Sequence, residues 1–166
     1  MCCRMFQMKK IISILFTFIF TFAAFAQSAD VITDILESDD ATYGQVCYLI
    51  ASQQQLILDG ATYVHAVETL YENGQITELY SEDDAITAID AAYLLSHMWN
   101  VKGGLMYRLT KGAPRYVFRQ FQSDGIIAAS VQPKDHISGS DILSMYTSCL
   151  RKYGDFDITE ISMGDE

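Results

Sequence analysis

The chain of 166 residues carries 21 acidic and 11 basic side chains, a formal net charge of −10, and half of its residues are hydrophobic. This acidic balance argues against a nucleic-acid-binding protein and gives no net attraction to an anionic membrane. The length suits one domain with a hydrophobic core.

The first 26 residues have the layout of a cleavable secretory signal peptide. Lys9 and Lys10 form a positive start, about a dozen almost wholly apolar residues follow at 11–22, and the small residues Ala24 and Ala26 precede a cleavage point. The apolar run is shorter than the ~20 residues that a membrane-spanning helix needs. We therefore expect an exported protein, periplasmic or associated with the cell envelope. Its mature chain of residues 27–166 would have no membrane span, eight basic and 21 acidic residues, and a net charge of −13.

Three segments of the mature chain predict helices that begin alike. Each has an Asp three positions before a Thr or Ser, and an acid or amide three positions after it. A Thr or Ser hydroxyl in this place caps the first free backbone N–H groups, and the later side chain can complete a capping box. The three pairs are Thr42 with Gln45, Thr87 with Asp90, and Ser138 with Asp141. We expect these helices to end near residues 57, 100 and 153.

The three predicted helices also share an apolar face. Hydrophobic residues recur four, five, seven and eight positions past each cap, which is the spacing of one side of a helix. They are Val46, Cys47, Leu49 and Ile50; then Ala91, Ala92, Leu94 and Leu95; then Ile142, Leu143, Met145 and Tyr146.

A second shared unit precedes the later two caps. Gly74 stands 13 residues before Thr87, and Gly125 stands 13 residues before Ser138. Each glycine follows an apolar helical pattern and is expected to end that helix in a left-handed conformation. An extended connector would then lead to the next cap. The sequence thus predicts a partial repeat at about 31–58, full repeats at about 60–101 and 112–153, and an acidic tail at 154–166.

Charge is divided unevenly between the two halves of the mature chain. Residues 27–100 contain 13 acids and no Lys or Arg, whereas residues 101–153 contain all eight basic residues and three acids. Oppositely charged parts of one domain can face each other or simply be solvated. Alternatively, the basic residues form a surface for an anionic envelope polymer. The loop at 102–114, rich in Gly and basic residues, is the expected flexible or binding segment.

The repeat unit resembles the S-layer homology (SLH) repeat. The resemblance is carried by Ala66-Val67 through Gly74-Gln75-Ile76 with Ile86-Thr87-Ala88-Ile89-Asp90, and by Val117-Phe118 through Gly125-Ile126-Ile127 with Ile137-Ser138-Gly139-Ser140-Asp141. It implies a mostly α, compact domain of SLH-like helix-loop-helix units, arranged around a pseudo-threefold axis. It also implies a non-enzymatic module that binds a cell-wall polymer or peptidoglycan. The family's motif has Arg directly after the capping Thr, and here those positions are Tyr43, Ala88 and Gly139.

Ligand-binding candidates follow from this resemblance and from the basic second half. Arg115 and Arg119 are candidate substitutes for the missing motif cations, and Trp99 is a candidate sugar-stacking residue. The complete candidate set is Thr87, Asp90, Trp99, Arg115, Arg119, Ser138 and Asp141. The partner would be a cell-wall polymer or peptidoglycan. The alternative is a protein–protein interaction or assembly module that recognises another envelope protein.

Cysteine and histidine positions bear on disulfides, metals and catalysis. Cys47 and Cys149 could form one disulfide in an oxidising compartment, or remain buried free thiols. His65, His97 and His136 are spread over three elements without the spacing of a metal site. We therefore expect no metal, no cofactor and no enzymatic activity.

Overall fold

Helices begin at all three predicted caps. The Thr42 hydroxyl accepts a hydrogen bond from the Gln45 N–H at the start of α2 (Tyr43–Gln53), and the Gln45 side chain accepts one from the Thr42 N–H. Thr87 caps α4 (Ala88–Met98) and Ser138 caps α7 (Gly139–Tyr153) in the same way. In these two helices the shorter Asp side chain accepts from the capping hydroxyl instead of the capping backbone N–H.

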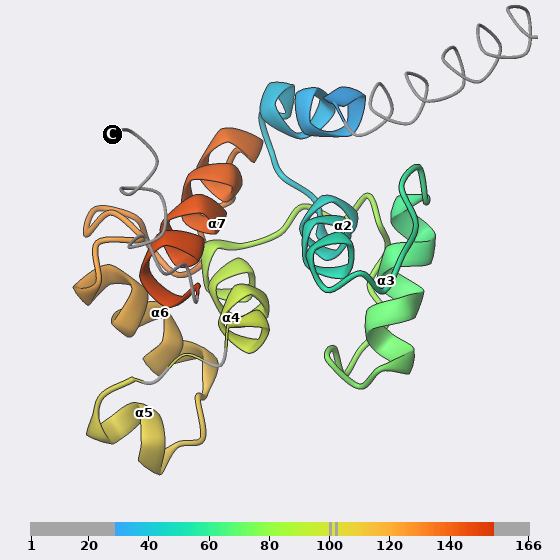
Figure 1. Ribbon diagram of the computed structural model, residues 1–166. Coiled ribbons are helices and arrows are strands. Elements are labelled where there is room, and N and C mark those ends of the chain that lie inside the picture. Colours follow the sequence, from blue (N-terminus) through green and yellow to red (C-terminus); the bar gives the residue numbers. More distant parts are fainter. Residues whose placement is uncertain (1–28, 100, 102, 155–166) are drawn as a thin grey trace, which may run out of the picture.

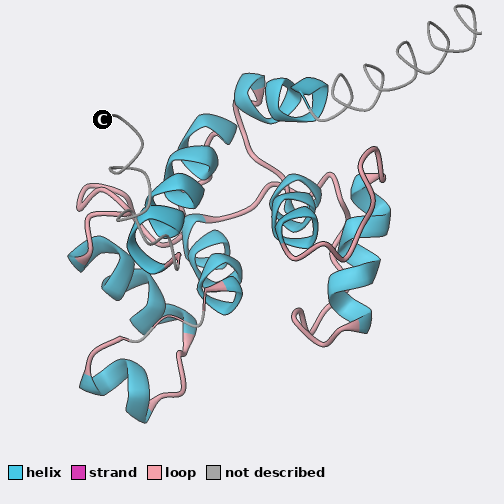
Figure 2. Ribbon diagram, viewed as in Figure 1, coloured by secondary structure: helices cyan, strands magenta, loops and turns pink. Residues whose placement is uncertain are grey.

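The computed structural model describes residues 29–99, 101 and 103–154. The predicted signal peptide at 1–26 and nearly all of the acidic tail lie outside the described residues. The other helices are residues 29–37, α3 (Tyr63–Glu72), α5 (Leu105–Leu109) and α6 (Pro114–Ser123). This part of the chain is a compact all-α domain of about seven helices, without a strand among the residues described (Figures 1 and 2).

Two glycines end helices as predicted. Gly74 follows α3 with φ +69° and Gly125 follows α6 with φ +73°, both in the left-handed region. The next N–H in each case bonds back into the helix, from Gln75 to the Leu70 carbonyl and from Ile126 to the Phe121 carbonyl. Both ends therefore have the hydrogen bond of a Schellman-type helix end.

Two local predictions were wrong. The predicted end of α2 near residue 57 lies beyond the true end at Gln53, because Gln55 adopts a positive φ of 57° that no α-helix can continue through. The loop at 102–114 contains the short helix α5, which its Gly and basic composition did not indicate.

Backbone hydrogen bonds join every pair of the three capped helix starts. The Ala41 N–H donates to the Ile137 carbonyl at 2.7 Å, and the Ala41 carbonyl accepts from Ile86 at 2.9 Å. The second and third starts are joined by the N–H of Ala88 and the carbonyl of Asp135, also at 2.9 Å. Segments far apart in sequence therefore meet at the middle of the domain.

The core forms where the apolar helix faces converge on these joined starts. Its largest fully buried side chains come from residues 29–37, from α2 to α4, from α6 and α7, and from one connector. They are Ile35, Ile50, Leu70, Ile86, Leu95, Phe121 and Ile142.

Helix pairs surround this core. α2 packs against α3 and α4 packs against α6. The helix at 29–37 meets the start of α7 so closely that a Cβ on Gly139 would lie 1.6 Å from the Ile35 carbonyl oxygen. No helix in the described ranges is both long enough and apolar enough to cross a bilayer.

Candidate functional site

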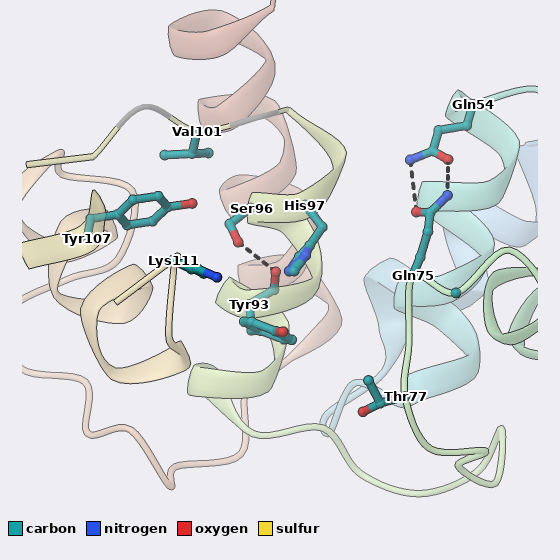
Figure 3. Close-up of a pocket in the computed structure, with 10 residues that line it drawn as sticks. Gln54, Gln75, Thr77, Tyr93, Ser96, His97, Val101, Tyr107 and Lys111 are labelled. Carbon is teal, nitrogen blue, oxygen red and sulfur yellow. Dashed lines mark hydrogen bonds between the residues drawn. The ribbon is translucent and has the colours of Figure 1, made fainter. Parts of the chain in front are cut away.

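An open groove of about 590 Å³ lies where the C-terminal ends of α2 and α3 face α4 and α5 (Figure 3). Its lining comes from α4 and α5 and from the segments that follow α2, α3, α4 and α5. The lining side chains with hydrogen-bonding or stacking groups are Gln54, Gln75, Thr77, Tyr93, Ser96, His97, Tyr107 and Lys111.

Two glutamines form one side of the groove. Gln54 follows the last residue of α2, and Gln75 follows the glycine that ends α3. Their side-chain amides exchange two hydrogen bonds, at 3.1 Å and 2.6 Å, which holds both planes in place. Each amide has two donor hydrogens and two acceptor lone pairs, so this exchange leaves both with unused capacity. The pair is thus an oriented set of donors and acceptors beside the groove.

α4 supplies the middle of the groove. Tyr93 and His97 lie one turn apart on this helix, with ring centroids 4.4 Å apart in an edge-to-face arrangement. Partial burial lowers the pKa of His97 below its usual 6.5. The imidazole is therefore neutral at pH 7 and can both donate and accept a hydrogen bond.

Tyr107 and Lys111 form the opposite side of the groove (Figure 3). The Tyr107 ring lies against Gly103, where a Cβ would be 2.3 Å from the ring's Cγ atom, so the missing side chain makes room for the ring. Lys111 follows α5 in a left-handed turn with φ 53°. It is the one lining residue with a formal charge at pH 7, so the groove is weakly positive in a strongly acidic protein.

Aromatic faces, fixed amides, a hydroxyl and one cation are groups that bind polyhydroxylated ligands, with a preference for neutral or anionic ones. The serine in the lining, Ser96, donates its hydroxyl hydrogen bond to the Tyr93 carbonyl at 2.7 Å rather than to a histidine. Among the residues described, no cluster of three or more His, Cys, Asp or Glu side chains is placed to hold a metal ion.

The sequence-predicted candidates lie elsewhere and are not brought together. Thr87 with Asp90, and Ser138 with Asp141, hydrogen-bond within the caps of two different helices. Trp99 follows α4 and packs edge-to-face against Tyr146 of α7, with ring centroids 5.3 Å apart. None of these residues lines the groove at α4 and α5.

The two candidate arginines also lie outside this groove. Arg115 and Arg119 are exposed on α6, and Arg119 borders a separate hollow between α5 and α6. The cation that the structure places in the groove is Lys111, which follows α5 in the loop predicted to be a binding segment.

The residues that directly follow the three caps are packed inside the domain. Tyr43 is buried and stacks on Tyr80, with ring centroids 4.1 Å apart, and Ala88 is fully buried. Gly139 has no room even for a Cβ beside the Ile35 carbonyl. An arginine directly after any of the three caps would therefore have no exposed position in this domain.

Cys47 and Cys149 are free, buried thiols on α2 and α7, so this structure contains no disulfide between them. Burial raises the pKa of each thiol to about 12. Both are protonated at neutral pH and behave as small apolar core residues.

Sequence reasoning missed most of the groove. Tyr93 and Tyr107 are sugar-stacking candidates by residue type alone, but nothing local distinguishes them from core aromatics. Gln54 and Gln75 meet only because two helices end side by side. The one local signal for the groove is Gly74. Because this glycine ends α3, it predicts that Gln75 lies at the end of a helix.

Comparisons of the chain with protein-family models, with curated proteins and with solved structures found no match. The resemblance to SLH repeats therefore depends on the short sequence motifs alone.

Proposed function

We propose that this protein is an exported, non-enzymatic cell-envelope protein that binds a cell-wall polymer or peptidoglycan in the groove between α2, α3, α4 and α5. The observation that carries the proposal is the composition of that groove. It combines two half-buried tyrosines, Tyr93 and Tyr107, a fixed pair of glutamine amides and Lys111, with no carboxylate in its lining. An uncharged or anionic glycan chain matches this set of groups.

An SLH-like, pseudo-threefold arrangement is part of the same proposal. It is supported by the second helix of each unit packing on the first helix of the next: α2 on α3, and α4 on α6. Close contact between α7 and residues 29–37 supplies the third such pair. The signal peptide supplies the export step, and with it the access to wall polymer.

Retention of the purified protein on insoluble peptidoglycan and on isolated wall polymer tests this function. Replacing Tyr93 by Ala removes a stacking face and should weaken retention by about threefold to tenfold, because one aromatic contact is worth about 0.5–1.5 kcal/mol. Tyr71, an exposed tyrosine of α3 outside the groove, gives the matched control Tyr71→Ala, which should leave retention unchanged. No retention of the unmodified protein at low salt would overturn polymer binding.

Two substitutions that each remove one lysine charge test the role of Lys111. Lys111→Gln should weaken retention of an anionic polymer and reduce its salt dependence, whereas Lys134→Gln, an exposed lysine outside the groove, should change neither. Equal effects of the two substitutions would contradict a specific role for the groove.

The second candidate function is a protein interaction or assembly module. It is favoured by the division of charge, with no basic residue in 27–100 and all eight of the mature chain in 101–153. Surfaces of opposite sign allow two copies or two proteins to associate in a defined orientation. Light scattering coupled to size exclusion separates the candidates, since a stable oligomer that dissociates at high salt supports assembly.

A further inference from the structure

The short helix α5 carries its apolar side chains on the outside. Leu105, Met106 and Leu109 are 71 %, 55 % and 67 % exposed. At 3.6 residues per turn these three lie within an arc of about 100°. Tyr107 lies on the opposite side of the helix, packed against Gly103 and against the core. The helix is thus anchored by its tyrosine and presents its hydrophobic face to the surroundings.

This orientation is the reverse of a surface helix in a folded domain, which turns its apolar face inward. The other large exposed hydrophobic residues of the described surface occur singly or in pairs, such as Ile32 with Leu36 and Leu56 with Leu58. On α5, three exposed apolar side chains within five residues form a contiguous patch. Contiguous apolar patches of this kind are typical of interaction surfaces. Figure 1 shows α5 at one end of the molecule, on a segment that projects beyond α4 and α6.

The charge around the patch indicates which kind of partner fits it. No acidic residue occurs in 91–123, a segment that contains five of the eight cations of the mature chain. Arg108 lies on α5 itself and is exposed. Arg119 borders the hollow between α5 and α6 together with Leu105 and Met106. An apolar patch bordered by cations, with no carboxylate in its own segment, is complementary to anionic lipid headgroups lying over acyl chains.

We propose that α5 is a membrane-docking helix, which inserts Leu105, Met106 and Leu109 into the interface of a bilayer containing anionic phospholipid. Arg108 and Arg119 would bind the lipid headgroups. The rest of the protein stays in water. The net negative charge does not prevent this, because ionic screening limits repulsion to about 10 Å at ordinary salt and the cations are the local charges. Docking would hold the protein at a lipid surface without a membrane-spanning helix.

Depth-dependent quenching tests insertion at this helix. A tryptophan introduced as Leu105→Trp should be quenched by vesicles of brominated phosphatidylglycerol at least about twofold more than one introduced as Leu58→Trp, because only the first enters the interface. Leu58 is 85 % exposed and lies outside the patch. Both variants share the same residues 1–26, so any binding by that segment is common to them. Equal quenching would overturn the proposal.

Vesicle co-sedimentation tests the patch as a unit. The triple change Leu105→Ser, Met106→Ser and Leu109→Ser should lower affinity for phosphatidylglycerol vesicles by about tenfold or more, since three exposed apolar side chains lose their burial. The matched change Leu58→Ser with Leu79→Ser removes exposed leucines elsewhere and should leave affinity unchanged. Circular dichroism should be the same for all variants, because these side chains are solvent-exposed.

Two further measurements test whether an anionic membrane or a second copy of the protein covers the patch. Phosphatidylcholine vesicles, or salt raised to about 0.5 M, should reduce binding several-fold, because the headgroup contacts are electrostatic. Binding to neutral vesicles as strong as to anionic ones would contradict the role of the arginines. An unmodified protein that dimerises without lipid and becomes monomeric on the triple change would show that a second copy covers the patch, and would overturn membrane docking.

Discussion

The Tyr153 hydroxyl donates a hydrogen bond to the Asp124 carboxylate, and this contact ties the last turn of α7 to the end of α6. Lys152 adds an ion pair, with its Nζ atom 2.6 Å from Oδ1, and Gln120 donates at 3.0 Å. Burial alone would raise the pKa of Asp124, but the hydrogen bonds from these three neighbours outweigh it and lower the pKa below its usual 3.8. The two helices are therefore joined through one ionised side chain.

Asp124→Asn should lower the free energy of unfolding by about 1–2 kcal/mol at pH 7, because it weakens several hydrogen bonds to a charged group. A depressed pKa in the folded state contributes stability above the usual value, and this contribution is lost as the pH falls through the folded pKa. The difference between the two proteins should thus be constant from pH 5 to 7 and shrink below about pH 3.8. Urea unfolding at several pH values measures it. A stability difference that did not change with pH would contradict the ionised contact. The matched control is Asp83→Asn, a substitution of an exposed aspartate.

Gly139→Ala should destabilise the domain by about 1–3 kcal/mol or more, because the new methyl group would overlap the Ile35 carbonyl, a backbone atom that cannot rotate away. Gly104→Ala is a matched control, since the nearest atom to its added Cβ is 3.9 Å distant. Urea unfolding should separate the two variants clearly. A Gly139→Ala variant as stable as the control would show that residues 29–37 do not pack on α7 as described.

Gly74→Ala and Gly125→Ala should each cost about 1 kcal/mol, because both positions require a left-handed backbone that a Cβ disfavours. No atom lies within 4 Å of either added Cβ, so backbone strain is the only penalty. Asn tolerates this conformation better, and Gly74→Asn and Gly125→Asn should recover part of the loss. Thermal unfolding measures all four. A large loss at one position alone would indicate that the two helix ends are not equivalent.

The buried thiols should be unreactive in the folded protein. A thiol reagent at pH 8 should label Cys47 and Cys149 only in urea, because each thiol is inaccessible and its pKa is raised to about 12. Peptide mapping locates the label. If labelling in urea required prior reduction, the two residues would form a disulfide in the isolated protein, and the free-thiol structure would not describe that form.

The helix caps and helix-ending glycines could be predicted from sequence because their signals are local. Thr42, Thr87 and Ser138 are identified by residues three positions away, and Gly74 and Gly125 by a conformation that other residues avoid. The groove has no such signal. Gln54 and Gln75 contact each other across two helix ends, a relation fixed by tertiary packing rather than by spacing.

The sequence-predicted binding residues lie apart from the groove for a related reason. Thr87 and Asp90 were identified by a spacing that serves the helix cap, and the cap leaves their side chains engaged with each other. Trp99 was chosen by residue type, but its ring packs on Tyr146 beside the core. A motif can thus identify an element's start without identifying a ligand contact.

The hydrogen bonds of Ala41 have a consequence for how the protein acquires its structure. Its N–H and carbonyl bind residues from both later helix starts, so the middle of the domain closes only when segments from nearly the whole described chain have met. Open arrays of repeats can fold unit by unit. In this domain, by contrast, the chain loses loop entropy when distant segments meet, before the long-range contacts that offset this loss have formed. The domain should therefore appear and disappear in one cooperative transition, and a fragment ending before Ile137 should have no stable fold of its own.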